Sequence, residues 1–270
     1  TLPHVHHLRH THLEEHQFVQ GQPETGGLDL ANDLQQIIQL CGGENIAACI
    51  VEPVAGSTGV LVPPVGYLER LRTLCDQHGI LLIFDEVITG FGRLGKAFAA
   101  QAFNVTPDII TMAKALTNGV LPLGAVASRD DIYQTVTEAV GEKAIEFCHG
   151  YTFAGCPSAT AVALASLKAY EEEKLFERSH ELSSYFQRGL FSLKGGKKVQ
   201  NIRGYGLMGA IDVTPIPQKP GAAGFSAFQE LFDKGILTKA TGDAILVAPP
   251  FVASTQELDE IIEKLQDVLL

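Results

Sequence analysis

Four short apolar runs are the first regular feature of the chain, and each has the length and composition of a buried strand. Stretches of helical period separate them, an alternation typical of a mostly parallel sheet with helices on both faces. We therefore predict an α/β fold. The predicted strands are "IAACIVEPV" (46–54), "ILLIFDEV" (80–87), "DIITMAK" (108–114) and "GAVAS" (124–128).

The segment "GYLERLRTLCDQHG" (66–79) between the first two runs predicts a helix. Apolar residues recur along one face of it, and Gly79 is a natural C-terminal glycine. The residues of this face are Leu68, Leu71, Leu74 and Cys75. Together with the two flanking runs, the helix makes one strand–helix–strand unit.

From Pro157 the pattern becomes helical, with a break expected near Glu173 and Lys174. We interpret this segment as a long connection into a smaller α+β domain, with residues 1–165 in a large domain and 166–270 in the small one. Its expected strands lie in "GLMGAIDV" and "AILVAPPFV", and "KGGKKVQ" (194–200) and "IPQKPGAAG" (216–224) are expected loops. A closing helix should begin at Ser254, which forms a capping box with Glu257. The buried stripe of that helix is Leu258, Ile261, Ile262, Leu265 and Val268.

Composition narrows the classes of partner. A formal charge of −11 with only 20 Lys and Arg disfavours a nucleic-acid or anionic-membrane surface, which needs clustered cations. No apolar segment reaches the roughly 18–20 residues that span a bilayer, and the N-terminal residues lack the layout of a signal peptide. We expect a soluble cytoplasmic protein whose partners are small molecules and protein. The first residue is Thr1 rather than Met, so we expect a piece of a longer chain.

The five cysteines are odd in number and form no CxxC pair, so we expect reduced thiols. Six of the nine histidines lie in "HVHHLRHTHLEEH" (4–16), but their spacing fits no tight set of metal ligands. The glycines of "GLMGAID" form no strand-to-helix fingerprint with a later acidic residue, so we expect no dinucleotide-binding site. The cysteines are Cys41, Cys49, Cys75, Cys148 and Cys156.

Two charged residues stand at the ends of apolar runs. Asp85 ends "LLIFD" and Lys114 ends "DIITMAK", and open α/β sheets bind ligands at the carboxyl ends of their strands. One interpretation is a buried ion pair in a dry environment. The other is that a cofactor lies between them, with the lysine reacting with an aldehyde and the carboxylate holding a proton on a pyridine nitrogen.

A resemblance favours the second interpretation. The blocks "EPVAGSTGVLVPPVGYLERLRTLCDQHGILLIFDEVITGFGRLGKAFAA", "TPDIITMAKALTNGVLPLGAV" and "HGYTFAGCPSATAVALA" resemble, in this order, those of the class III pyridoxal-phosphate (PLP) aminotransferases. The sequences "EPVAGSTGVL" and "FDEVITGFGR" are most similar to those of the omega-amino acid:pyruvate (β-alanine:pyruvate) aminotransferases. The resemblance runs along essentially the whole chain and implies PLP-dependent fold type I.

The resemblance also implies roles for four residues. Lys114 would bind the PLP aldehyde covalently and then move a proton as acid and base. Asp85 would bond the pyridinium nitrogen, and Val87, two residues further on, would pack against the ring. Thr152 in "HGYTFAGCP" would reach the cofactor phosphate of the neighbouring subunit, which implies a homodimer with shared sites.

Two further residues are matched to the substrate pocket by the resemblance. Glu52 matches a family glutamate near that pocket, and the alternative is a carboxylate that stabilises the turn before Pro53. Lys239 in "LTKATGD" takes the place of the usual arginine that receives a substrate carboxylate. Lysine keeps the charge but loses the two-pronged geometry, and the alternative is a solvated surface lysine. By the resemblance, we expect the phosphate loop and the ring-stacking aromatic residue of the family upstream of the segment that begins here.

The sequence therefore predicts a PLP-dependent transaminase that moves an amino group from an omega-amino acid or amine to pyruvate. Two alternatives remain. The first is an enzyme similar to glutamate-1-semialdehyde 2,1-aminomutase, which shares the lysine and the aspartate. The second is a catalytically incomplete fragment that does not turn over.

Overall fold

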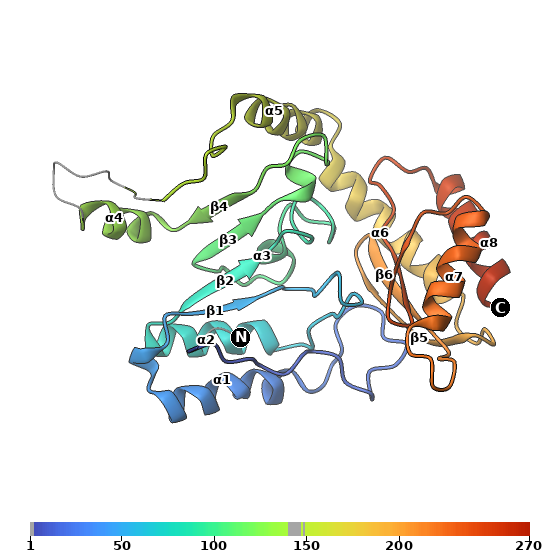
Figure 1. Cartoon of the computed structure of the whole chain (residues 1–270), viewed down its shortest axis with the longest axis horizontal. Helices are drawn as coiled ribbons and strands as arrows, with labels where there is room; N and C mark the ends of the chain where they lie inside the picture. Colours follow the sequence, from blue (N-terminus) through green and yellow to red (C-terminus); the bar gives the residue numbers. More distant parts are fainter. Residues whose placement is uncertain (1–2, 140–146, 148) are drawn as a thin grey trace.

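The computed structural model describes residues 3–139, 147 and 149–270, which form two β-sheets connected by two successive helices (Figure 1). Cys148 lies outside the described residues. The other four cysteines are free thiols, as expected.

The first sheet has the order β1-β2-β3-β4. Its first three strands are mutually parallel, and β4 runs antiparallel to β3. All four strands fall within the predicted apolar runs, although each is shorter than its run. They are β1 (Ala48–Val51), β2 (Leu81–Asp85), β3 (Ile109–Met112) and β4 (Ala125–Ser128).

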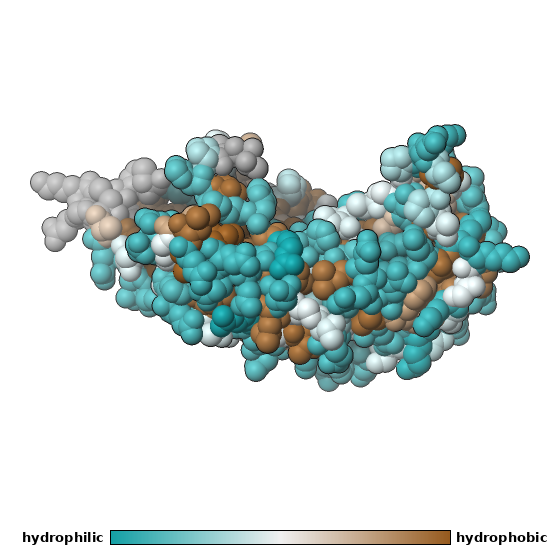
Figure 2. Space-filling model, turned by 90° about the horizontal axis from the view of Figure 1, so that it is seen from below, coloured by the Kyte–Doolittle hydropathy of each residue, from teal (hydrophilic) through white to brown (hydrophobic). Residues whose placement is uncertain are grey.

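Helices α1 and α2 cover one face of this sheet (Figure 1). Leu68, Leu71 and Leu74 of α2 share a buried cluster with Leu82 and Phe84 of β2, so the predicted helical face is confirmed. The side of the molecule that contains α1 is mostly hydrophilic, with separate hydrophobic spots (Figure 2). The helices of this part are α1 (Gly27–Cys41), α2 (Tyr67–His78), α3 (Ala99–Ala102) and α4 (Asp130–Glu138), with 3-10 turns η1 (Gly43–Asn45) and η2 (Lys114–Leu116).

The opposite face of the first sheet is open in the described part of the chain. Strand register places Ile50, Ile83 and Ile109 in one row across that face. Ile50 is 61% exposed, and Val126 of β4 is 69% exposed. The α/β architecture is as predicted, but the described helices bury only one face of the sheet at these positions. We call the face that carries Ile50, Ile83, Ile109 and Val126 the open face.

Two helices lead to the second sheet, α5 (Pro157–Glu172) and α6 (Leu175–Phe191). The chain breaks between them at Lys174, whose φ of 50° interrupts the helix where the sequence predicts it. The predicted domain boundary between residues 165 and 166 falls inside α5 and stays a prediction.

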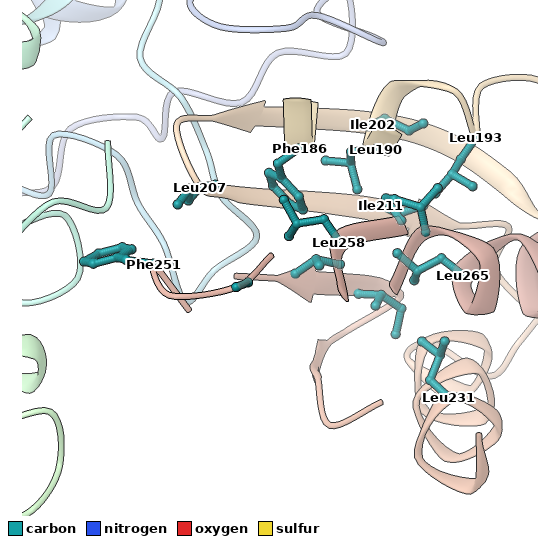
Figure 3. Close-up of a cluster of buried hydrophobic side chains, with 14 of the residues drawn as sticks. Phe186, Leu190, Leu193, Ile202, Leu207, Ile211, Leu231, Phe251, Leu258 and Leu265 are labelled. Atoms are coloured by element: carbon teal, nitrogen blue, oxygen red, sulfur yellow. The ribbon is translucent and has the colours of Figure 1, made fainter. Parts of the chain in front are cut away.

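The second sheet is antiparallel throughout, with the order β5-β6-β8-β7. Its helical side is a dense apolar core in which Phe186 and Leu190 of α6 point toward Ile211 of β6 and Leu258 of α8 (Figure 3). The strands are β5 (Val199–Tyr205), β6 (Met208–Val213), β7 (Lys239–Thr241) and β8 (Ala244–Val247), and the remaining helices are α7 (Ala222–Asp233) and α8 (Thr255–Leu269). The capping box of Ser254 and Glu257 at the start of α8 is confirmed.

Two predicted loops extend past the start of the element that follows them. The segment 194–200 runs into β5, and 216–224 runs into α7. Strand β5 lacked an apolar signal because two of its buried residues are polar. Asn201 accepts a hydrogen bond from the Phe18 N–H at 2.6 Å, and Arg203 pairs with Asp212, so burial is compensated by contacts that periodicity does not show.

None of the described helices is long and apolar enough to cross a bilayer.

Candidate active site

Asp85 is the last residue of β2, at the carboxyl end of the sheet. Leu82 and Phe84 point into the core against α2, and the alternation of the strand turns Asp85 toward the open face. Its Oδ1 accepts hydrogen bonds from the Val87 N–H and from the Thr111 hydroxyl, both at 3.2 Å. Among the described residues no hydrogen bond reaches Oδ2, so one oxygen of this carboxylate is held and the other is free to bind a donor.

Lys114 lies just beyond β3, as the first residue of the turn η2. Its φ of 45° is in the left-handed region, which costs a non-glycine residue on the order of 1 kcal/mol or more. The turn is fixed from α5, because the Tyr170 hydroxyl lies 2.8 Å from the Ala115 carbonyl oxygen and 3.1 Å from Asn118 Oδ1. A strained backbone held in place by a buried tyrosine is typical of a functional position.

The topology brings Asp85 and Lys114 to neighbouring strand ends. Asp85 is the register partner of Thr111 on β3, and Lys114 follows Thr111 by three residues, roughly 10 Å of extended chain. The ion pairs of the described residues do not include Asp85 with Lys114, so the ion-pair interpretation is not supported. The dry environment was also predicted wrongly for Lys114, whose side chain is exposed, because the apolar run before it faces an uncovered side of the sheet.

The two residues after Asp85 have different roles. Glu86 is fully buried and points away from the site, toward α3. Its carboxylate accepts hydrogen bonds from the N–H groups of Ala99 (2.6 Å) and Ala100 (3.1 Å) and from the Thr89 hydroxyl (3.0 Å). Burial raises the pKa of the Glu86 carboxyl, and these hydrogen bonds oppose the rise. Val87 is half-buried and lies beyond the end of β2, so its packing against a ring stays a prediction.

Glu52 and Lys239 both contact the loop 52–61. Glu52 begins this loop after β1 of the first sheet, and Lys239 reaches it from β7 of the second sheet. Glu52 follows β1, and its Oε2 accepts a hydrogen bond from the Gly56 N–H at 3.2 Å, the contact expected of a turn-stabilising carboxylate. Lys239 begins β7, and its Nζ lies 3.5 Å from the Ser57 carbonyl oxygen. Lys239 is exposed, and Thr241 also donates to Ser57 O, at 2.9 Å. The structure thus brings both candidate substrate residues to the loop 52–61.

Thr152 is not brought to the other candidates within one chain. It is exposed, and its neighbours Tyr151 and Phe153 are 81% and 82% exposed. No side-chain hydrogen bond of Thr152 is found among the described residues. Its role toward a neighbouring subunit stays a prediction.

Arg93, inside the "FDEVITGFGR" block, connects the two halves of the molecule. Its Nη1 donates to the carbonyl oxygens of Leu207 (2.9 Å) and Pro249 (2.7 Å), and its guanidinium lies 4.7 Å from the centre of the Phe251 ring. Burial lowers the pKa of Arg93 to about 10. In the sequence, Arg93 carries no functional signal beyond its place in the block "FDEVITGFGR".

A surface groove of about 330 Å³ lies between the N-terminal segment and the second sheet, and Arg203, Asp212 and Thr241 are among its lining residues. Neither Asp85 nor Lys114 lines it. We therefore place the candidate site on the evidence of strand topology and hydrogen bonding rather than on the shape of this groove.

Thr111 is the site residue that the sequence analysis missed. Its hydroxyl contacts Asp85 only because β2 and β3 pair in this register. The available signal was its position three residues before Lys114, in a strand adjacent to the one that ends at Asp85.

Comparisons with known proteins identify the family of this chain. Residues 1–269 match the family described as aminotransferase class-III. The chain is 48% identical over 266 residues to an omega-aminotransferase of Caulobacter vibrioides, and 47% identical over 266 residues to a beta-alanine–pyruvate aminotransferase of Pseudomonas aeruginosa. Each alignment covers 98% of this chain, but only 60% and 59% of the respective relatives.

The similar solved structures are also transaminases. A transaminase with L-alanine has a TM-score of 0.86 and 34% identity, over 90% of this chain and 58% of the other. The omega transaminase from Pseudomonas jessenii in complex with PMP has a TM-score of 0.85 and 35% identity, over 92% of this chain and 56% of the other. The α/β fold is therefore that of the PLP-dependent transaminases, fold type I.

The chain spans about 60% of the length of the curated relatives that it matches. The family match extends over nearly the whole chain, and the identities lie well above the level at which family membership is in question. The chain belongs to the class-III aminotransferase family.

Proposed function

We propose that this chain carries the lysine and aspartate of a PLP-dependent transaminase that transfers an amino group from an omega-amino acid or amine to pyruvate. The observation that carries the proposal is that Asp85 and Lys114 stand at the ends of adjacent parallel strands, Asp85 as the last residue of β2 and Lys114 just beyond β3. The names of the two curated relatives support the transfer to pyruvate and the omega-amino donor.

The residues at the strand ends fit PLP. The Oδ1 atom of Asp85 is occupied by two protein donors, which leaves Oδ2 to accept a hydrogen bond from a protonated ring nitrogen. Lys114 offers an exposed amine on the adjacent strand end. When bound, PLP supplies a pyridinium ring that takes up negative charge from the reacting carbon.

Each residue then has a defined task. Lys114 takes a proton from the amino-bearing carbon of the donor and returns it at the neighbouring position, which makes it the acid and base of the reaction. Asp85 keeps the ring nitrogen protonated, and Val87 packs against the ring. Thr152 donates its hydroxyl to the cofactor phosphate of the partner subunit in a homodimer.

Substrate binding is assigned to the loop 52–61 and the start of β7. Lys239 would bind the carboxylate of the keto acid through a single ammonium group rather than through a bidentate guanidinium. Glu52 lies on the same loop, and its carboxylate would attract or repel the charged groups of the substrate. Both assignments fit the contact of Lys239 with Ser57 and the placement of Glu52 at the beginning of this loop.

A second candidate is a chain of this family that does not turn over by itself. The exposure of Ile50 and Val126 on the open face favours it, because Asp85 and Thr111 lie on that face and would face water. The aminomutase alternative finds no support, since the relatives and structures reported above carry transaminase names. A cytoplasmic location stays a prediction from composition.

Visible absorbance tests the proposal. The purified 270-residue chain is incubated with PLP and dialysed, and the band of lysine-bound cofactor is recorded. We expect the band in the wild type and in Lys168→Ala, an exposed lysine on α5, but not in Lys114→Ala. Absence of the band from the wild type would overturn the proposal for this chain.

Turnover separates the remaining candidates. An omega-amino donor with pyruvate should give the corresponding aldehyde and alanine. A chain that shows the band but no transfer is the second candidate, and activity on glutamate-1-semialdehyde alone would revive the aminomutase.

A further inference from the structure

Asp85 and Thr111 form a cross-strand pair at the carboxyl end of the first sheet. They are register partners on β2 and β3, and both side chains are half-buried on the open face. The Thr111 hydroxyl and the Val87 N–H donate to the same atom, Asp85 Oδ1, each at 3.2 Å. One donor therefore comes from the neighbouring strand and the other from the turn that follows Asp85.

We propose that Thr111 is a positioning residue that holds Oδ1 of Asp85 and so presents Oδ2 to the protonated nitrogen of the cofactor ring. The proposal deepens the function proposed above and rests on it for the identity of the ring. The placement of Thr111 against the carboxylate is independent of any cofactor.

The need for such a residue follows from the freedom of a carboxylate. The terminal torsion of an aspartate is broad and roughly two-fold, so a half-buried Asp85 without partners would exchange its two oxygens readily. Two donors on one oxygen, approaching from different segments, remove that freedom. The geometry is then fixed before a ligand arrives, which lowers the entropic cost of binding.

The hydroxyl of Thr111 can hold the Asp85 carboxylate without occupying a cation such as Lys114. Glu52 follows Val51, the register partner of Phe84, so a second carboxylate stands at the next strand end. Lys114 stands on the other side, and Glu86 is turned toward α3. Thr111 holds Asp85 without using the charge of Lys114, whose amine then stays available for the reaction.

The first experiment needs no cofactor. The Val87 amide donates to Asp85 Oδ1, so its hydrogen exchange reports on how firmly that oxygen is held. In the full 270-residue chain, Thr111→Val should speed exchange at Val87 by about two- to tenfold, the equivalent of one ordinary hydrogen bond. Thr111→Ser, which keeps the hydroxyl, should restore protection.

Thr106→Val is the matched control, because Thr106 is exposed and lies before β3. It should leave exchange at Val87 unchanged. Equal protection in the wild type and Thr111→Val would overturn the proposal. Equal loss in Thr111→Val and Thr111→Ser would also overturn it, because packing rather than the hydroxyl would then be responsible.

The second experiment links Thr111 to the ring nitrogen. Affinity is measured for PLP and for an analogue in which carbon replaces that nitrogen. Thr111→Val should weaken PLP by about two- to tenfold and leave the analogue unchanged. Equal weakening of both ligands would contradict a role through the nitrogen.

The two experiments separate the two proposals. If the wild type binds no PLP but Thr111→Val still speeds exchange at Val87, the proposed function fails while Thr111 still positions Asp85. If PLP binds and neither exchange nor affinity responds to Thr111→Val, the function stands and the positioning role is wrong.

Discussion

The two sheets of this molecule differ in how completely they are buried. The second sheet has a core on both sides, with Ile211 of β6 facing the helices α6 and α8 and Ala210 packed in the cluster of the first half of the chain. In the described part of the chain, α1 and α2 cover one face of the first sheet, and its other face exposes Ile50 and Val126. The candidate chemistry lies at the end of the first sheet, on its open face. We therefore expect substitutions in the second sheet to cost more stability than substitutions on the open face, beside which the candidate reactive groups lie.

The buried charge pair of the second sheet provides the largest test. Arg203 is 8% exposed, donates to Asp212 from Nη1 and Nη2, and donates from Nε to the Gly59 carbonyl oxygen at 2.6 Å. Arg203→Met should lower the free energy of unfolding by about 3–5 kcal/mol, because it leaves a partly buried carboxylate without its partner. Urea denaturation measures the change.

The control for this charge pair is Lys234→Met, which removes a surface pair with Asp267 and should cost about 0.2–1 kcal/mol. Equal losses of unfolding free energy from the two substitutions would mean that the buried contacts of Arg203 with Asp212 and Gly59 do not stabilise the second sheet.

A matched pair of isoleucines compares the sheets directly. Ile211 is fully buried in β6, whereas Ile50 is 61% exposed in β1. Ile211→Ala should cost about 2–5 kcal/mol in unfolding free energy, and Ile50→Ala should stay within about 0.5 kcal/mol of the wild type. A cost of several kcal/mol at Ile50 would show that the open face is covered in solution.

Glu86 tests the buried side of the first sheet. Replacing it by glutamine removes one acceptor from the N–H groups of Ala99 and Ala100, and the expected cost is about 1–3 kcal/mol in unfolding free energy. Because burial raises the pKa of the folded carboxyl, the folded state binds the proton more tightly than the unfolded state does. The resulting stability is present below the unfolded value and is lost as the pH rises through the folded value.

The cost of Glu86→Gln should therefore be larger at pH 5 than at pH 8. Chemical denaturation of both proteins at the two pH values gives the difference directly. A cost that grows with pH would mean that the site favours the charged carboxylate, contrary to the raised pKa.

The smallest effect on stability is expected on the open face itself. The double substitution Ile50→Thr and Val126→Thr should change the unfolding free energy by no more than about 0.5 kcal/mol per site, because both side chains already contact water. It should also reduce concentration-dependent light scattering, since exposed apolar patches promote association. Unchanged scattering would argue that this face does not drive self-association.

The sequence by itself determined most of the first sheet and the closing helix. The apolar runs around Leu82 and Ile110, the helical face that contains Leu71 and the capping box at Ser254 are local patterns, and local patterns are what periodicity and capping rules describe. The ends of two apolar runs located Asp85 and Lys114 in the same way, and the resemblance added the roles expected of them. Strand β5 was missed because Asn201 and Arg203 are buried polar residues whose partners lie elsewhere in the sequence.

Only the tertiary structure decided how the candidate residues stand to one another. The register of β2 with β3 places Thr111 against Asp85, and strand pairing in the second sheet brings Lys239 to Ser57. These contacts join residues that are 26 and 182 positions apart. The exposure of Lys114 could not be predicted from the sequence either. Its burial depends on which other segments pack over the strand end, and an apolar run does not indicate which of its two faces is covered. Strand pairing and the covering of faces are set by long-range packing, and these decided the site.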